Sequence, residues 1–400
     1  MAENLPLAYD YHGTQPIDFP FNQLSPQDID IYMDVDTYIG NETCGQNCKN
    51  CWFVNIDKVK RKRFDIPEGQ KIVSDLRQAG FNIFPRYTDT FAYGGEFMLA
   101  YGTSVARVYA EKETRQPTLT MKKGEAWTSG KPLLGQNAEQ LLDIAREHNY
   151  GTISMSFHGV VDSTGAILPE ADYPIKGVFH ASRYHEVVKI IKDYNEKNKD
   201  EYFQGFRINV GLTLGTHNSS TEQLVNYLDY FNNLGVSTVR FNRFFDHGKR
   251  HPMLELQENE IIVIYDKIKK LHETVPLSFQ INMSGDLGTS GVDVLEFPKN
   301  VNLCKGGRQL FAMIPCEKEM LPGSGTNRQL HKVGELTACV NLFEPTLGCV
   351  VREVKDSTTR YFVNWDYSEI EKLLAFRKGP LCENGCFSRD LNNALERNEY

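Results

Sequence analysis

The sequence lacks the features that mark exported, membrane-spanning and nucleic-acid-binding proteins. Met1 is followed by neither a basic nor an apolar segment, so no secretory signal is visible. The longest apolar runs, such as Ile261–Tyr265, are far too short to cross a bilayer. The formal net charge is −8, which argues against the basic footprint that non-specific nucleic-acid binding requires. We therefore expect a cytoplasmic protein that contacts neither a membrane nor nucleic acid.

What the chain does contain is typical of a soluble globular protein. Hydrophobic residues make up 40% and charged residues 24% of its 400 residues. That length suffices for one large domain or for a barrel with an appendage. The nine cysteines, in a chain without an export signal, favour reduced thiols that bind metal or take part in catalysis over a disulfide scaffold.

Strand and helix signals alternate along the first three quarters of the chain. Strands are expected at about 28–36, 91–95, 125–128, 151–157, 207–213 and 238–242, and helices at 67–79, 138–148, 183–197, 222–234 and 258–273. Such alternation implies parallel strands joined by right-handed crossovers. We predict an α/β fold with a partial (βα)6 TIM-like barrel, a complete eight-unit barrel being the alternative. The predicted domains are an N-terminal lead at 1–28, the barrel at 29–298 and a cysteine-rich C-terminal domain at 299–400.

Three cysteines lie within eight positions, directly after the first predicted strand. Cys44, Cys48 and Cys51 have the spacing C-x3-C-x2-C. Three thiols that close cannot all pair as disulfides, whereas three thiolates suit zinc or an iron–sulfur cluster. A structural zinc site normally needs a fourth Cys or His, and the sequence has none between residues 37 and 90 other than these three. A 4Fe-4S cluster with three protein ligands would leave one iron open, on a loop where α/β barrels place catalytic groups.

This motif, in this place, resembles that of the radical S-adenosylmethionine (SAM) enzymes. Three further segments resemble family motifs in the right order: Gly94-Gly95-Glu96, the turn Trp127–Gly130, and Ile153–Gly159, in which Ser156 is the matching serine. The resemblance implies that Cys44, Cys48 and Cys51 hold a 4Fe-4S cluster whose open iron chelates SAM. It also implies that Gly94, Gly95 and Glu96 bind the SAM amino group and that Ser156 reaches the ribose or carboxylate. Physically, the glycines allow close approach of the backbone, and a carboxylate suits an ammonium.

The chain departs from the family pattern beside the third cysteine. Where relatives often carry an aromatic residue that packs on adenine, this chain has Asn50, and Trp52 and Phe53 follow the cysteine. Asn50 and Phe53 are therefore candidate cofactor contacts, with the adenine partner left open. His158 and His217 follow predicted strands and are as compatible with structural hydrogen bonding as with acid–base work. Catalytic residues stay unassigned.

A second group of six cysteines lies after residue 300. Gly334 and Cys339 give G-x4-C, and Cys382 and Cys386 give C-x3-C. This group resembles the C-terminal auxiliary-cluster extensions called SPASM or, when shorter, twitch domains. The resemblance implies an auxiliary 4Fe-4S cluster, and Cys304, Cys339, Cys382 and Cys386 are the preferred ligands. Cys316 and Cys349 would be structural thiols, alternative ligands or a hydrogen-atom donor. The alternative is a collection of buried cysteines without a cluster.

The function that this resemblance implies is reductive cleavage of SAM to a 5′-deoxyadenosyl radical, which abstracts hydrogen from a substrate. The leading hypothesis for the substrate is a ribosomally made peptide that undergoes cross-linking, epimerisation or rearrangement. The alternative is an oxidoreductase or epimerase that acts on a small metabolite such as an aminosugar or amino acid. An electron donor such as flavodoxin or ferredoxin is implied in either case. A non-catalytic metal-binding module is a third interpretation, against which Glu96 argues because a bare metal scaffold has no use for an amine ligand.

Overall fold

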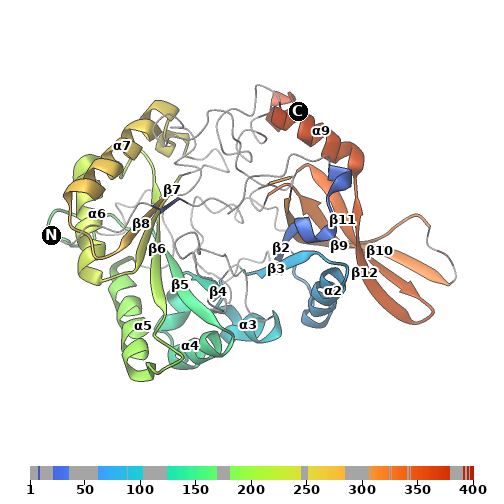
Figure 1. Cartoon of the computed structure of the whole chain (residues 1–400), viewed down its shortest axis with the longest axis horizontal. Coiled ribbons are helices and arrows are strands. Elements are labelled where there is room, and N and C mark those ends of the chain that lie inside the picture. The colour runs from blue at the N-terminus through green and yellow to red at the C-terminus, as the bar shows by residue number, and fades with distance from the viewer. Residues whose placement is uncertain are drawn as a thin grey trace. The chain divides into compact units, whose positions relative to one another are not determined.

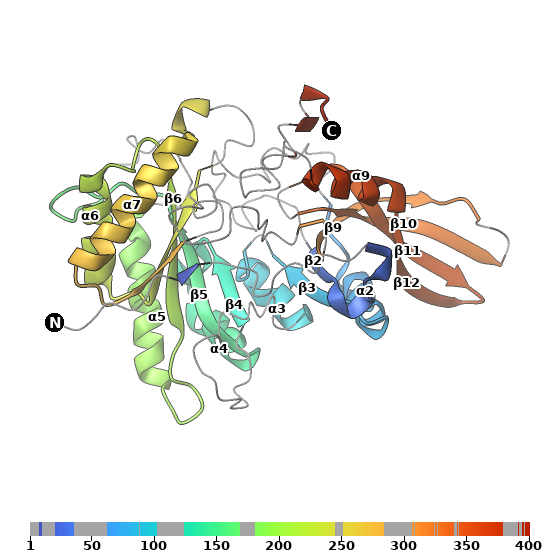
Figure 2. The same cartoon turned by 45° about the horizontal axis from the view of Figure 1, so that its top comes forward.

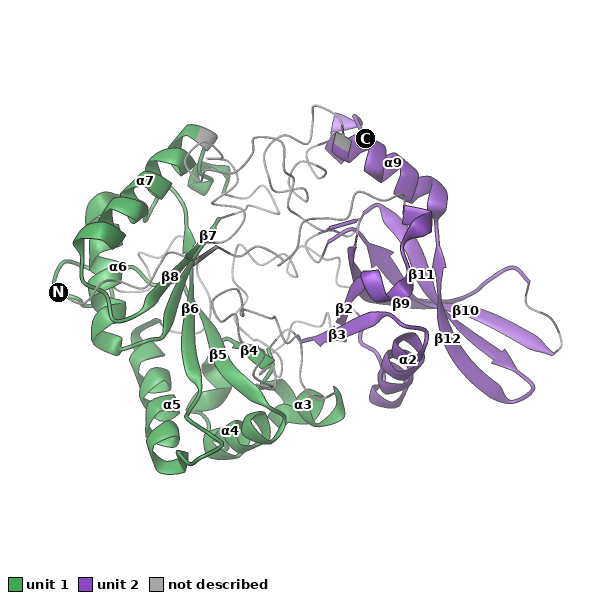
Figure 3. Ribbon diagram, viewed as in Figure 1, with its two compact units in different colours: residues 1–11, 39–55, 89–301 green, residues 12–38, 56–88, 302–400 purple. Residues whose placement is uncertain are grey.

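A computed structural model of the chain describes two compact units. The described residues are 8–9, 21–35, 62–87, 89–101, 124–168, 181–244, 251–283, 306–307, 309–323, 325, 327–339, 342, 344–378, 391, 394–395 and 397–400. The first unit consists of residues 1–11, 39–55 and 89–301, and the second of residues 12–38, 56–88 and 302–400 (Figure 3). Each unit has its own sheet, and each is described by itself.

The first unit is built on a parallel sheet of six described strands. In sheet order they are β1 (Ala8–Tyr9), β8 (Gln280–Met283), β7 (Thr238–Arg243), β6 (Arg207–Leu214), β5 (Tyr150–Phe157) and β4 (Gly124–Thr128). The helices between them are α3 (Glu96–Tyr101), α4 (Ala138–Glu147), α5 (Tyr184–Asn198), α6 (Thr221–Leu234) and α7 (Glu258–Thr274). From β4 to β8 each strand pairs in parallel with the next along the chain. Figures 1 and 2 show α4 to α7 along one side of this sheet.

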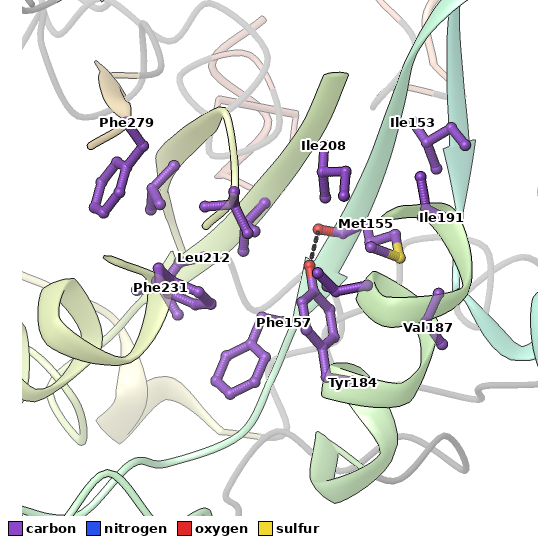
Figure 4. Packing of buried hydrophobic residues seen from close by; sticks show 14 of the residues in the cluster. Ile153, Met155, Phe157, Tyr184, Val187, Ile191, Ile208, Leu212, Phe231 and Phe279 are labelled. Atoms are coloured by element: carbon purple, nitrogen blue, oxygen red, sulfur yellow. Dashed lines mark hydrogen bonds between the residues drawn. The ribbon is translucent and has the colours of Figure 1, made fainter. Parts of the chain in front are cut away.

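The helix-facing side of the sheet forms the core of the first unit. Alternate residues of β5, namely Ile153, Met155 and Phe157, are fully buried. The ring of Phe157 makes edge-to-face contacts with Tyr184 of α5 and Phe231 of α6, at centroid distances of 5.1 and 5.2 Å (Figure 4). Because successive side chains of a strand point to opposite faces, the residues between these point away from the helices.

The second unit has a mixed sheet, one helix packed against it and a C-terminal helix. In sheet order its strands are β12 (Thr358–Trp365), β11 (Thr346–Lys355), β10 (Arg328–Thr337), β9 (Leu310–Met320), β2 (Asp30–Asp34) and β3 (Asn82–Arg86), and its helices are α2 (Ile66–Gln78) and α9 (Tyr367–Lys378). The pairs from β9 to β12 are antiparallel, whereas β2 is parallel to both β3 and β9. Two residues with positive φ, Asp356 and Ser357, join β11 to β12 in a tight hairpin.

Contacts distant in sequence hold the second unit together. Asp75 on α2 accepts a hydrogen bond of 2.9 Å from the Tyr361 amide of β12, and the Tyr361 hydroxyl donates to Glu68 at 3.2 Å. Phe21, Phe311 and Trp365 form an aromatic cluster with centroid distances between 4.8 and 5.6 Å. The segment around residue 21 thus packs with strands β9 and β12, which lie near the C-terminus of the chain.

Most sequence-based element predictions are confirmed, and one is wrong. The expected helices and the strands β2 and β4 to β7 lie within two residues of their predicted bounds. The strand expected at 91–95 is instead a 3₁₀ helix at Ala92–Gly95, and the strand that precedes it in the chain is β3. The chain turns there because Asp89 binds the Phe91 amide and because residues 93 to 95 all have positive φ.

Of the predicted barrel strands, the first, β2, lies in a sheet with β3 and β9, and the four from β4 to β7 lie in the sheet of the first unit. Both sheets contain parallel pairs, so the fold is α/β as expected. The closure of six strands into a partial barrel stays a prediction. The domain boundaries at residues 28 and 298 stay predictions as well. Among the described helices, none is long and apolar enough to cross a membrane.

Candidate functional site

The Gly94-Gly95-Glu96 segment forms an open turn with unusual backbone angles. Tyr93 (φ 52°, ψ 35°), Gly94 (φ 64°, ψ 22°) and Gly95 (φ 82°) are all left-handed. For a residue such as Tyr93 this conformation is strained, and strain of this kind tends to gather at functional sites. A Cβ built on Gly94 would meet no heavy atom of the described residues within 4 Å. Glu96, the first residue of α3, is exposed. The turn therefore leaves space for a ligand beside Gly94.

Gly95 faces the protein interior, in contrast to Gly94. A Cβ on Gly95 would lie 3.2 Å from the side-chain ends of Ile144 and Met98, and 3.3 Å from that of Leu141. Ile144 and Leu141 belong to α4. The two glycines thus have different roles: Gly95 lets the turn pack closely against α4, and Gly94 keeps its outer side open.

A buried carboxylate joins this turn to the end of β4. Asp89 is 1% exposed. Its Oδ1 accepts a hydrogen bond from the Phe91 amide at 3.0 Å, and its Oδ2 accepts from the Ser129 amide at 2.8 Å and hydroxyl at 2.7 Å. The Thr90 amide also donates to the Trp127 carbonyl at 2.8 Å. Burial raises the pKa of Asp89, and its hydrogen bonds from Ser129, Thr128 and Phe91 oppose that shift.

Asp89 brings together two segments that the sequence analysis matched separately, the Gly94–Glu96 turn and the turn at Trp127–Gly130. The sequence analysis did not identify this residue. The signal that was available is local: an Asp two residues before a turn commonly accepts a hydrogen bond from the backbone that follows it.

Ser156 lies on the face of the first unit's sheet that points away from the helices. It is opposite Gly211 of β6, which is opposite Arg240 of β7, and Arg240 is opposite Asn282 of β8. The guanidinium of Arg240 lies 5.9 Å from the centre of the Trp127 ring. A Cβ on Gly211 would lie 3.4 Å from the Asn242 amide nitrogen and 3.7 Å from the Trp127 ring. Ser156 therefore belongs to a polar surface that runs across four strands.

The same face carries a buried acid that the sequence analysis did not single out. Glu125 of β4 is 7% exposed and accepts a hydrogen bond from the hydroxyl of Ser154, which is fully buried. Its other oxygen, Oε2, is buried and has no hydrogen-bond partner among the described residues. Glu125 pairs with Thr152 of β5, on the same face of the sheet as Ser156.

His158 and His217 follow the neighbouring strands β5 and β6 and lie close enough to interact electrostatically. Burial lowers the pKa of each to about 4, and His217 lowers that of His158 further. Neither Nδ1 atom has a hydrogen-bond partner among the described residues. Both imidazoles are therefore neutral at physiological pH, which allows each to accept a proton or a hydrogen bond.

Three of the C-terminal cysteines lie in or next to the sheet of the second unit. Cys316 is on β9 and Cys349 on β11, with β10 between them, whereas Cys339 lies two residues after β10 ends. Two strand spacings separate Cys316 from Cys349, about 9–10 Å, which is too far for a disulfide. Burial raises the pKa of Cys316 to about 12 and also raises that of Cys349. Both thiols are thus protonated at neutral pH. Gly334 lies on β10, so the G-x4-C segment starts on a strand of this sheet.

The remaining predicted site residues lie outside the described residues. They are the cluster ligands Cys44, Cys48, Cys51, Cys304, Cys382 and Cys386 and the cofactor contacts Asn50 and Phe53. Within the described part of the chain, no group of three His, Cys, Asp or Glu side chains is arranged to hold a metal ion. The metal sites therefore stay predictions. For SAM, the open turn at Gly94 and the exposed carboxylate of Glu96 fit an ammonium ligand.

The fold of the chain is similar to that of SuiB from Streptococcus suis. A crystal structure of SuiB bound to precursor peptide SuiA matches with a TM-score of 0.50 and 12% sequence identity, over 82% of this chain and 63% of that one. A crystal structure of SuiB bound to S-adenosylmethionine matches with a TM-score of 0.49 and 11% identity, over 80% and 62%. The chain thus spans less than two thirds of the length of SuiB. No protein-family model and no curated protein sequence matches the chain.

Proposed function

We propose that the chain is a radical SAM enzyme with a partial barrel and an auxiliary-cluster domain of the SPASM or twitch type. The observation that supports this most is the open Gly94–Glu96 turn, which Asp89 joins to the carboxyl end of a parallel strand. Parallel α/β sheets bind ligands at that end of their strands. The cysteine spacing and the SuiB-like fold are independent support.

In this proposal Cys44, Cys48 and Cys51 hold a 4Fe-4S cluster, and the bound cluster with SAM supplies a 5′-deoxyadenosyl radical. The chain's own residues bind and orient SAM. Glu96 accepts hydrogen bonds from the ammonium, Gly94 lets the ligand approach the backbone, and Ser156 donates to the ribose or carboxylate. Asn50 and Phe53 are the proposed neighbours of the adenine. Positioning matters because the site of hydrogen abstraction depends on which C–H bond is held near the radical.

The auxiliary cluster is proposed to be held by Cys304, Cys339, Cys382 and Cys386. Four protein thiolates would close its coordination, which favours electron transfer over direct substrate binding. Cys316 and Cys349, which lie on strands of the sheet, would then be structural thiols, alternative ligands or a hydrogen-atom donor. A flavodoxin or ferredoxin is the proposed source of the electron that starts each turnover.

The proposed substrate is a ribosomally made precursor peptide, which is modified by cross-linking, epimerisation or rearrangement. This rests on the fold shared with SuiB, which binds precursor peptide SuiA in the matched structure. The alternative substrate is a small metabolite such as an aminosugar or amino acid.

The test uses protein purified and reconstituted without oxygen. We expect the reduced protein to convert SAM to 5′-deoxyadenosine, and Cys44→Ala/Cys48→Ala/Cys51→Ala to abolish the conversion. A triple variant that still cleaves SAM would refute the assignment. If a short open reading frame lies beside the gene, the peptide that it encodes is the candidate substrate. A change in the mass of that peptide that requires SAM, the reductant and the three cysteines would support the peptide substrate. The absence of such a change would favour the small metabolite.

A further inference from the structure

We propose that Asp89 is a positioning residue for SAM: it holds the Tyr93–Glu96 turn against the end of β4 so that Glu96 can receive the ammonium. The inference rests on the proposed function, which assigns the ammonium to Glu96. It adds a residue outside the three family motifs and a physical reason for the left-handed turn.

The two oxygens of Asp89 bind two different segments of the chain. Oδ1 accepts from the Phe91 amide, at the entrance to the turn, and Oδ2 accepts from the amide and hydroxyl of Ser129, after β4. All three partners are donors, so the site requires an acceptor at both oxygens. An Asn side chain would offer one acceptor and would direct its NH₂ group toward another donor. The geometry therefore selects a carboxylate over an amide of the same size.

Asp89 is almost fully buried, and its hydrogen-bond partners among the described residues are neutral groups. Burial disfavours the ionised carboxylate and raises its pKa, whereas the hydrogen bonds that it accepts favour the ionised form. The donors on Phe91 and Ser129 therefore offset part of the cost of burying a carboxylate at this position.

The turn itself needs support from outside. Three successive left-handed residues, one of them Tyr93, are intrinsically unfavourable. Such conformations persist only where the surroundings over-determine them. Asp89 fixes the start of the turn, and Gly95 fixes its end by close packing on α4. Loss of Asp89 should therefore release Glu96 from its position without disturbing the core.

The experiment measures SAM affinity by equilibrium dialysis on the full chain, reconstituted without oxygen. We expect Asp89→Asn to weaken SAM binding by about ten-fold or more, because a misplaced carboxylate loses much of a charge-assisted hydrogen bond. The matched control is Asp162→Asn. Asp162 likewise accepts hydrogen bonds from the Thr164 amide and hydroxyl and from the Ala166 amide, in an exposed turn of the same unit. That variant should bind SAM as wild type does.

A double-mutant cycle separates positioning from general stability. If Asp89 acts through Glu96, then Glu96→Gln should cost much less affinity in the Asp89→Asn background than in wild type. Additive losses, or unchanged affinity in Asp89→Asn, would overturn the inference. Ser129→Ala is the second variant in case Asp89→Asn fails to fold, since it removes one donor and keeps the carboxylate. We expect a smaller, three- to five-fold loss, and no loss would count against the proposal.

A measurement without cofactors distinguishes failure of this inference from failure of the proposed function. Hydrogen exchange of the 91–96 amides in cluster-free protein should accelerate in Asp89→Asn and stay unchanged in Asp162→Asn. If wild type binds no SAM, the proposed function is wrong and the positioning role falls with it, although accelerated exchange would still show that Asp89 clamps the turn. Unchanged exchange at 91–96 would refute the clamp itself.

Discussion

The hydroxyl of Tyr227 donates a hydrogen bond of 2.9 Å to the carbonyl of Gly159 and lies 3.5 Å from the Asn218 side-chain nitrogen. Gly159 follows His158, and Asn218 follows His217. Tyr227 of α6 therefore forms hydrogen bonds with both segments that carry these histidines. The Gly215 amide donates to the Asn218 side chain at 2.8 Å, which closes the turn around His217. Two neutral imidazoles are thus held in a fixed arrangement after adjacent strands.

The first prediction is that stability falls as the pH drops from about 6.5 toward 4. The folded pKa of His158 and His217, about 4, lies below the ordinary value of 6.5. Protonation therefore favours the unfolded state, and the stability present above pH 6.5 is lost as the pH falls through the folded pKa. The free energy of unfolding, measured in urea between pH 7 and 4, should fall less steeply with decreasing pH in His158→Asn/His217→Asn than in wild type. Equal slopes would contradict the neutral, buried state of both histidines.

Helices and strands with clear periodicity could be predicted from sequence, and contacts between distant segments could not. The helices α4 to α7 have regular apolar faces, and the strands β5 to β7 are apolar runs bounded by turns. By contrast, β3 contains Pro85 and few buried residues, so its pattern is weak. The pairing of β2 with β9 joins residues about 280 positions apart, and no local signal reports it.

The same contrast between local patterns and distant contacts applies to the residues of the candidate site. Gly94, Gly95, Glu96 and Ser156 could be proposed from motifs, because a motif is a local pattern. For Asp89, the hydrogen bond from the Phe91 amide has a local signal, but the contact with Ser129, 40 residues away, has none. Sequence alone also could not show that Cys316 and Cys349 lie on either side of β10, because that follows from strand pairing.

The second prediction concerns Glu96. Replacing Glu96 with Ala removes the proposed partner of the SAM ammonium, and SAM affinity should fall by about ten- to a hundred-fold, as expected for a charge-assisted hydrogen bond. Equilibrium dialysis measures the affinity, and the iron content should stay at the wild-type value because Glu96 is not a cluster ligand. Wild-type affinity in Glu96→Ala would remove the role assigned to this residue.

The third prediction compares the two glycines of the turn. Ala at either position is strained by positive φ, at a cost of about 1–2 kcal/mol. At Gly95 the added methyl group would also press on Ile144, Met98 and Leu141, which adds roughly 1–3 kcal/mol of overpacking. Gly95→Ala should therefore lower the free energy of unfolding more than Gly94→Ala, as measured by urea denaturation. Similar losses in both variants would mean that the turn does not pack on α4 as described.

The last prediction concerns the auxiliary cluster. Its proposed ligands are Cys304, Cys339, Cys382 and Cys386. These residues are distant in sequence and can converge only in a folded C-terminal region, so metal binding and folding should be coupled there.

The variant Cys44→Ala/Cys48→Ala/Cys51→Ala isolates this cluster. It should retain about four irons and the broad visible absorbance of a 4Fe-4S centre. Adding Cys382→Ala and Cys386→Ala should remove the remaining iron and make residues 300–400 more sensitive to proteolysis. The matched control is Cys316→Ala/Cys349→Ala in the same triple background, which should keep its iron because these two cysteines lie on strands of the sheet and are not among the proposed ligands. Loss of iron in the control would instead make Cys316 and Cys349 ligands, and a stably folded triple variant without iron would leave the protein with one cluster.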